Sequence, residues 1–133
     1  MAKFHVSLKK VVDDSYDIEI GHNLFDSLVS DLKNGLMPKA SRYALITDSN
    51  VAPLYAESLL QKMKNAGLSV DMLIMTAGEI NKSRETKSQL EDEMLALGFG
   101  RDSAIVALGG GVVSDLSGFL AGTFGRGIPF INY

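Results

Sequence analysis

Three consecutive glycines, Gly109 to Gly111, follow the apolar run 104–108 and precede Val112-Val113-Ser114-Asp115. Glycines between a strand and a helix let the backbone approach a ligand closely, and the first N–H groups of the helix can bind a phosphate. Asp115 falls early in that helix, where the helix dipole favours a carboxylate. The segment predicts a phosphate or nucleotide site, but a tight turn before an acidic helix start explains the same residues.

The glycine segment matches neither of two common phosphate-binding fingerprints. The pattern G-x-G-x-x-G needs glycine at position 114, where this chain has Ser114, and an acid about 20 residues further on, where the chain has the apolar segment 128–131. A P-loop needs Gly-Lys-Ser/Thr, which does not follow here. Any nucleotide site must therefore be of another kind.

A second polar segment, Gly78-Glu79-Ile80-Asn81-Lys82, follows the apolar run 70–75. Glu79 could accept hydrogen bonds from ribose hydroxyls, and Lys82 could bind a phosphate. A solvated loop whose charges serve the next helix is the alternative explanation.

A third polar segment, Thr47-Asp48-Ser49-Asn50, also follows an apolar run. Asp48 and Asn50 are ordinary turn and cap residues, so their types alone do not indicate a site. However, the carboxyl ends of parallel strands meet at one edge of a sheet, and open α/β sheets bind ligands there. We therefore expect the three polar segments to share one crevice.

Arg126, His5 and His22 are the remaining candidates for chemistry. Arg126 lies between two glycines, and its planar guanidinium suits a phosphate. A surface arginine favoured by the dipole at a helix C-terminus is the alternative. Neither histidine has a second ligand at metal-binding spacing, and the chain has no cysteine. We expect no metal site within these residues.

The hydrophobic pattern predicts the elements that position these segments. Strand-like runs alternate with helical patterns, which implies an α/β domain with a parallel sheet and flanking helices. The strands are expected at 43–47, 70–75, 104–108 and 128–131, and the helices at 23–35, 53–66, 83–97 and 112–124. Asn23 is the expected N-cap of the first helix. In residues 3–20, apolar and polar residues alternate on both sides of a turn, which predicts an N-terminal β-hairpin.

Length and charge narrow the function classes. The 133 residues suit one domain, and the net charge of −3 leaves no basic excess for binding nucleic acid. No run reaches the roughly 18 apolar residues of a membrane span, and no signal peptide is evident, so we expect a cytoplasmic protein. The chain stops in an apolar run at Tyr133, so we expect the natural polypeptide to continue.

Residues 107–119, Ala-Leu-Gly-Gly-Gly-Val-Val-Ser-Asp-Leu-Ser-Gly-Phe, and the following Arg126-Gly-Ile-Pro-Phe-Ile131 strongly resemble the 3-dehydroquinate synthase family. Thr47-Asp-Ser-Asn-Val-Ala-Pro-Leu-Tyr55 and Gly78-Glu-x-x-Lys82 fall in the family's order and spacing. The Glu-x-x-Lys motif is shared across the wider sugar-phosphate cyclases. The resemblance implies that residues 1–133 form the N-terminal NAD-binding domain, with a Rossmann-like sheet, and that the C-terminal metal-binding helical domain is absent from this chain.

The resemblance also implies an activity for the parent protein. The family consists of NAD-dependent lyases that carry zinc or cobalt and act as homodimers. They convert 3-deoxy-arabino-heptulosonate 7-phosphate into 3-dehydroquinate and phosphate, in the shikimate pathway of aromatic amino acid biosynthesis. The alternatives are the cofactor domain of another sugar-phosphate cyclase, that of a metal-dependent polyol dehydrogenase, or a stand-alone nucleotide-binding module without catalysis.

Roles carried over from the family fall on the three polar segments. Asp48 and Asn50 would contact the adenosine side of NAD, and Glu79 and Lys82 would hold its ribose and phosphate region. The last segment supplies the remaining cofactor-binding residues: Gly110, Gly111 and Val112 along the pyrophosphate, Val113 and Ser114 beside them, and Asp115 toward the nicotinamide ribose. Arg126 resembles the arginine that family dimers offer to the substrate phosphate of the neighbouring subunit.

This chain departs from the family pattern at three positions and lacks later motifs. Ser114 stands where the family commonly has Gly, and Ile80-Asn81 stand where Gln-Tyr is frequent. The family's Pro-Thr-Thr loop, its zinc-binding Glu and two His, and its catalytic lysines would all follow Tyr133. We therefore expect weak NAD binding and no synthase activity from the 133-residue chain alone.

Overall fold

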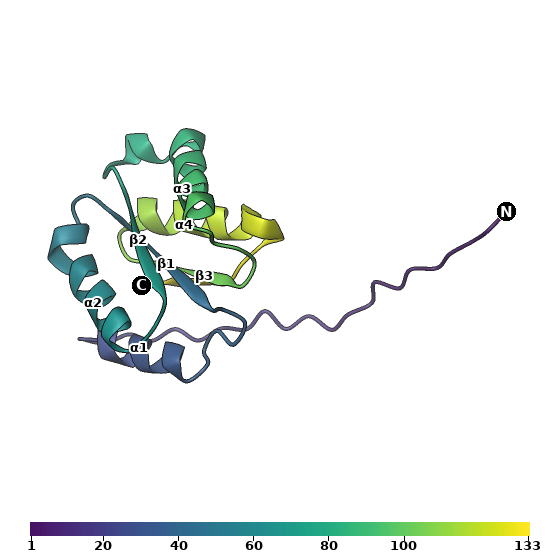
Figure 1. The fold of residues 1–133 in the computed structure, drawn as a ribbon, viewed down its shortest axis with the longest axis horizontal. Helices are drawn as coiled ribbons and strands as arrows, with labels where there is room; N and C mark the ends of the chain where they lie inside the picture. Colours follow the sequence, from purple (N-terminus) through teal and green to yellow (C-terminus); the bar gives the residue numbers. More distant parts are fainter.

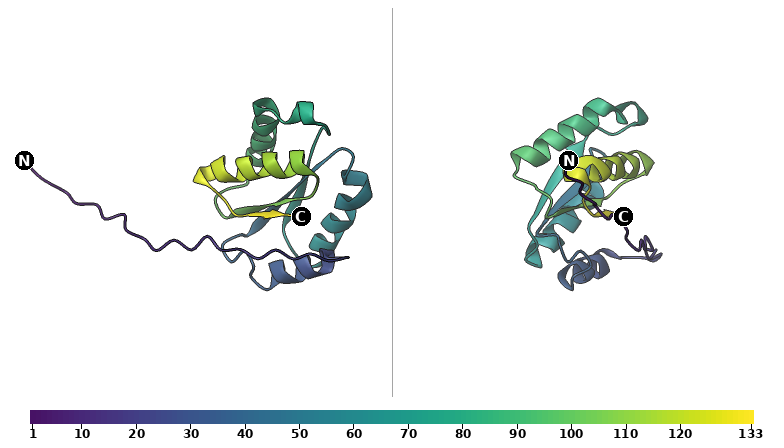
Figure 2. Two further views of the ribbon diagram at one scale, coloured as in Figure 1. Left: turned by 180° about the vertical axis from the view of Figure 1, so that it is seen from behind. Right: turned by 90° about the vertical axis from the view of Figure 1, so that its right-hand side faces the viewer.

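Four parallel strands form the centre of the computed structural model, which describes residues 1–133. The helices lie on both faces of this sheet, giving three layers (Figures 1 and 2). The strands are β1 (Arg42–Asp48), β2 (Val70–Met75), β3 (Ser103–Ala107) and β4 (Phe130–Asn132). The helices are α1 (Phe25–Lys33), α2 (Glu57–Asn65), α3 (Arg84–Ala96) and α4 (Gly111–Thr123), with a π-helical turn at Ala52–Ala56 and 3₁₀ turns at Glu79–Asn81 and Phe124–Arg126.

The strand order, β2-β1-β3-β4, creates a switch in direction at the centre of the sheet. From β1 the chain crosses through α2 to β2 on one side, and it then returns through α3 to β3 on the other side of β1. The connections that leave β1 and β3 therefore diverge to opposite faces. Doubly wound sheets bind ligands in the crevice that opens at such a point.

Both faces of the sheet are covered, which explains the continuous apolar runs of the central strands. Alternate residues such as Ile46 and Ile105 pack beneath α3 and α4, while Leu45 and Val106 face α1 and α2. All five residues of β3 are buried. The predicted α/β fold with a parallel sheet and flanking helices is confirmed.

Caps at the helix ends agree with the sequence pattern in most places. Ser83 is the N-cap of α3, where its hydroxyl accepts a hydrogen bond from the Thr86 N–H. Gly35, Gly67 and Gly98 follow α1, α2 and α3 with φ values of +91°, +84° and +81°. Positive φ suits glycine because it has no Cβ, so these residues end the helices as predicted.

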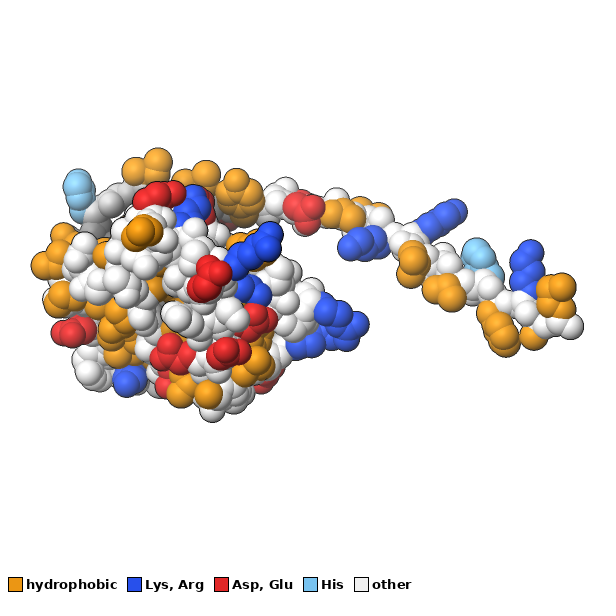
Figure 3. All heavy atoms as spheres, turned by 90° about the horizontal axis from the view of Figure 1, so that it is seen from above, with side chains coloured by type: hydrophobic (Ala, Val, Ile, Leu, Met, Phe, Trp, Pro, Cys, Tyr) orange, Lys and Arg blue, Asp and Glu red, His pale blue; other side chains and the backbone are white.

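The predicted N-terminal β-hairpin is wrong for this structure. Residues 1–22 contain no strand: the chain starts far from the body and then runs along its edge to α1 (Figures 1 and 2), and its apolar side chains are exposed (Figure 3). Only the turn is present, where Asp13 Oδ1 accepts from the N–H and the hydroxyl of Ser15. A two-stranded hairpin needs another strand or a helix to cover its apolar face, and no residue of this segment belongs to either core cluster.

Asn23 is not the N-cap of α1, contrary to the sequence expectation. The cap position is Leu24, which makes no side-chain cap bond, and Asn23 instead adopts a φ of +57°. Asparagine tolerates this left-handed conformation better than most residues, so Asn23 turns the chain into the helix without capping it.

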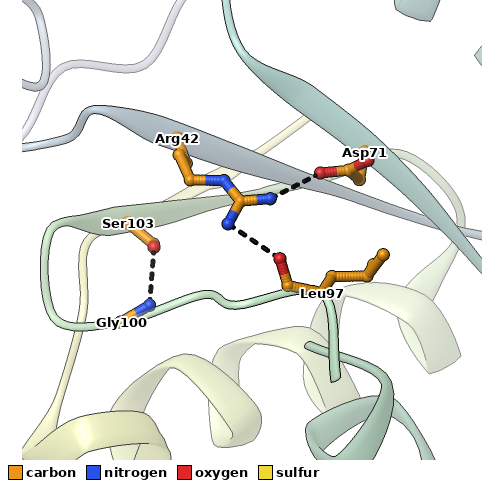
Figure 4. Close-up of polar contacts among 5 residues, drawn as sticks. All are labelled: Arg42, Asp71, Leu97, Gly100 and Ser103. Carbon is orange, nitrogen blue, oxygen red and sulfur yellow. Dashed lines mark hydrogen bonds and ion pairs between the residues drawn. The ribbon is translucent and has the colours of Figure 1, made fainter. Parts of the chain in front are cut away.

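A polar cluster lies at the edge of the sheet where the parallel strands begin (Figure 4). The guanidinium of Arg42 donates to Asp71 Oδ2 at 3.0 Å and to the Leu97 carbonyl at the end of α3 at 2.8 Å. It also lies 4.3 Å from the centre of the Phe99 ring. Close by, Ser103 Oγ accepts from the Gly100 N–H at 3.2 Å (Figure 4). These contacts join α3 to the first residue of β1.

Candidate functional site

The three polar segments singled out in the sequence lie together at the carboxyl edge of the sheet. Asp48 at the end of β1 is in register with Met75 at the end of β2, and Ile46 is in register with Ala107 at the end of β3. The segments that follow these strands therefore start from the same edge. This shared edge is where the expected crevice would lie.

The glycine segment presents open backbone to this crevice. A Cβ at Gly109 would lie 2.7 Å from the side chain of Val113, so only glycine allows the chain to turn so close to α4. By contrast, a Cβ at Gly110 or Gly111 would meet no atom within 4 Å. The N–H groups of Gly111 and Val112, in the first turn of α4, donate no hydrogen bond within the protein. The segment can therefore bind an anion through its backbone.

Val113 and Ser114 contribute less to this surface than their neighbours. The Val113 side chain is fully buried in the core, so Val113 can offer a ligand only its backbone N–H. The Ser114 N–H donates to the Gly110 carbonyl at 3.0 Å, and its hydroxyl donates to the Gly111 carbonyl at 3.2 Å. Both donors of Ser114 are thus engaged within the helix.

Lys82 and Asp115 are joined by an ion pair across the crevice. Lys82 Nζ lies 2.6 Å from Asp115 Oδ2 on α4 and 3.8 Å from Glu79 Oε1. The hydrogen bond and charge of Asp115, followed by the charge of Glu79, raise the pKa of Lys82 above its ordinary 10.5. Lys82 therefore stays protonated at neutral pH, with two carboxylates beside it.

A pocket of about 220 Å³ opens beside this ion pair, between the start of α3 and α4. Its lining includes three residues that the sequence analysis did not identify: Arg84, Lys87 and Phe119. Lys87 Nζ lies 5.9 Å from the centre of the Phe119 ring. Phe119 follows Asp115 by four residues on a helix, so it lies on the same face, and this spacing is the signal that could have found it.

Asp48 both caps a turn and keeps a free oxygen. Its Oδ1 accepts from the N–H groups of Asn50 and Val51, at 2.8 and 2.9 Å, as the turn interpretation predicts. Its Oδ2 makes no hydrogen bond in the structure and remains able to accept one. The turn and the ligand-binding interpretations of Asp48 are therefore compatible. The exposed side chain of Asn50 makes no hydrogen bond with the protein.

Arg126 is not brought to this crevice. It follows α4, whose 13 residues extend about 20 Å from the glycine segment toward the start of β4. Arg126 itself has a φ of +69° and lies between Gly125 and Gly127, at +54° and +108°. The exposed arginine is thus presented at the other end of α4.

The metal-binding side-chain types are dispersed over the chain. No group of three or more His, Cys, Asp or Glu side chains is placed to hold a metal ion. Both histidines lie in the exposed N-terminal segment.

No helix has the length and apolar character required to cross a membrane.

The sequence of this chain is similar to those of 3-dehydroquinate synthases. The sequence model described as 3-dehydroquinate synthase N-terminal matches residues 72–133. A 3-dehydroquinate synthase of Desulforamulus reducens is 42% identical over 118 residues, which cover 89% of this chain and 32% of that protein. The chain therefore spans about a third of the length of this curated relative.

Solved structures of sugar-phosphate cyclases share the fold. A 2-deoxy-scyllo-inosose synthase complexed with carbaglucose-6-phosphate, NAD⁺ and Co²⁺ has a TM-score of 0.74 and 29% identity, over 84% of this chain and 30% of that one. The 2-epi-5-epi-valiolone synthase of Streptomyces hygroscopicus, with NAD⁺ and Zn²⁺ bound, has a TM-score of 0.71 and 27% identity, over 97% of this chain and 34% of that one. By sequence, this chain is similar to the N-terminal region of 3-dehydroquinate synthases, and its fold is similar to that of the two cyclase structures.

Proposed function

We propose that residues 1–133 form the NAD-binding domain of a cytoplasmic 3-dehydroquinate synthase. The observation that carries this proposal is the open glycine backbone beside Lys82, Glu79 and Asp115 at the switch point of the sheet. Such an arrangement offers N–H donors and a cation to a pyrophosphate, and carboxylates to ribose hydroxyls. The NAD⁺ in the two solved structures supports this cofactor, and the name of the similar curated protein supports the synthase.

Each segment contributes a different contact to the bound cofactor. The N–H groups of Gly110, Gly111 and Val112 bind the pyrophosphate, with the Val113 N–H beside them and Ser114 closing the turn. Lys82 adds its positive charge while it keeps its bond to Asp115, because an ammonium has three donors. Glu79 and Asp115 accept from the ribose hydroxyls. Asp48, through Oδ2, and Asn50 contact the adenosine.

The whole reaction needs more than this domain. NAD, when bound, supplies a hydride acceptor for oxidation of a substrate hydroxyl. The residues described here do not suit a divalent metal, so we place the zinc or cobalt in a C-terminal metal-binding helical domain outside residues 1–133. We also propose that the parent protein is a homodimer in which Arg126 reaches the substrate phosphate of the neighbouring subunit. The distance of Arg126 from the crevice supports that role.

Gly110→Ala tests the carrying observation directly. A Cβ at Gly110 meets no protein atom within 4 Å, and the φ of −80° suits alanine, so the fold is retained. The added methyl occupies the space where the pyrophosphate would lie, so we expect the Kd for NAD to rise about tenfold or more by calorimetry. Gly122→Ala, also without a neighbour within 4 Å but inside α4, is the matched control and should bind normally.

Equal NAD binding by Gly110→Ala and the wild type would remove the glycine segment from the site. A separate assay identifies the substrate, because only the full-length parent can show it. Conversion of the heptulosonate phosphate supports a 3-dehydroquinate synthase, whereas turnover of another sugar phosphate alone would assign the domain to a different cyclase.

A further inference from the structure

The backbone of Ala77 is held from both sides by side chains that the proposed cofactor contacts do not include. Its N–H donates to Ser49 Oγ at 3.0 Å, and its carbonyl accepts from Asn81 Nδ2 at 2.9 Å. Ser49 belongs to the turn after β1, and Asn81 ends the 3₁₀ turn after β2. Two of the three cofactor-binding segments therefore meet at one residue.

Ser49 is itself held in a fixed position. Its N–H donates to the Met75 carbonyl at 2.9 Å, which extends the pairing of β1 and β2 one residue past Asp48. Asp48 Oδ1 closes the same turn through the N–H groups of Asn50 and Val51. The hydroxyl that receives the Ala77 N–H is thus attached to the end of a buried strand.

The position of Glu79 depends on this backbone because its side chain has little other support. The Glu79 side chain is 77% exposed, and its one charged neighbour is Lys82 at 3.8 Å. Gly78, next to Ala77, has a φ of +113°, and the turn is closed by bonds from the Asn81 N–H to Gly78 O and from the Lys82 N–H to Glu79 O. Because the turn starts directly after Ala77, fixing the backbone of Ala77 also fixes the positions of Glu79 and Lys82.

We infer that Ser49 and Asn81 are positioning residues that clamp Ala77 and so set Glu79 and Lys82 toward the cofactor; the inference rests on the proposed function. With the Lys82–Asp115 pair, two side-chain contacts join the segments after β1, β2 and β3 before any ligand arrives, and the Asn81 bond braces the middle segment internally. A site ordered in advance loses less conformational entropy on binding, so breaking the clamp weakens binding without removing a ligand contact.

Calorimetric titration of the chain with NAD tests the role of the clamp. We expect Ser49→Ala and Asn81→Leu each to raise the Kd about three- to tenfold, the effect of one lost hydrogen bond. Ser49→Thr keeps the hydroxyl and should restore the Kd to within about twofold of the wild type. Ser88→Ala is the control, because Ser88 is exposed on α3 and makes no side-chain hydrogen bond.

Amide hydrogen exchange of Ala77, measured without NAD, tests the clamp independently of binding. Ser49→Ala should speed its exchange about fivefold, and Ser49→Thr should not. Unchanged exchange in Ser49→Ala, or normal NAD binding by that variant, overturns the inference alone. Failure of the wild type to bind NAD overturns the proposed function and this inference with it.

Discussion

Lys82 carries a positive charge that is paired with Asp115 in α4, the helix that begins at the glycine segment, and the pKa of Lys82 sets the pH range in which that charge is present. Asp115 first, and then Glu79, raise the pKa above 10.5. A raised folded-state pKa means that the stability contributed by Lys82 is fully present below 10.5 and is lost as the pH rises through the folded value. NAD affinity should therefore show no loss attributable to Lys82 between about pH 6 and about pH 9.

Lys82→Met should raise the Kd for NAD about tenfold at low salt, because one charge-assisted contact to phosphate is lost. The fall of affinity with added salt should also become shallower, since the exposed charge is screened. Titrations at two salt concentrations check both effects. Lys39→Met, at an exposed lysine without an ion pair, is the control. A salt dependence identical to that of the wild type would separate Lys82 from the phosphates.

At the scale of the elements, Arg42 supports the fold without taking part in the site. Its guanidinium bonds to Asp71 and the Leu97 carbonyl and stacks on Phe99, at the edge opposite the glycine segment. Arg42→Met should lower the free energy of unfolding by about 1–3 kcal/mol. Chemical denaturation measures that loss, and the Kd for NAD should stay unchanged. Arg84→Met, at an exposed arginine on α3, should not alter the stability comparably.

The elements predictable from the sequence are those fixed by local patterns. The apolar runs of β1 and β3, the glycines that end three helices and the Ser83 cap all depend on neighbouring residues. The hairpin prediction failed because alternation shows which side chains need cover, not whether cover exists. The Lys82–Asp115 pair joins residues 33 apart in the sequence, so no local pattern predicts it. The Asn81 bond to Ala77 needs the turn at Gly78, which the residue types alone do not specify.

At the scale of the whole molecule, the N-terminal segment contributes no residue to the folded core. No hydrogen bond joins residues 1–20 to the rest, and nine of their large apolar side chains are exposed: Met1, Phe4, Val6, Leu8, Val11, Val12, Tyr16, Ile18 and Ile20. Exposed apolar side chains favour association. Removing residues 1–20 should leave the Tm within about 2 °C of the full chain and reduce self-association in sedimentation. A large fall in Tm would show that the segment packs on the body.

Turnover of substrate is also a property of the whole molecule. We expect this chain to bind NAD through the proposed site. Because it lacks a metal-binding cluster, we expect no turnover of the heptulosonate phosphate when NAD and zinc are supplied. Phosphate release from that substrate is the measurement. Release above the rate without protein would contradict the assignment of the catalytic metal to another domain.

Helix α4 begins at the glycine segment and ends three residues before Arg126, so its length sets the distance between the glycine segment and Arg126. In the proposed dimer, the N-terminal end of α4 contacts the cofactor of its own subunit, and Arg126 beyond its C-terminal end contacts the substrate of the neighbouring subunit. Adding a single residue within α4 would turn Arg126 by about 100° about the helix axis and shift it by about 1.5 Å. The number of residues in α4 would then set the spacing of the two reaction centres, and substitutions along it would be tolerated far better than insertions.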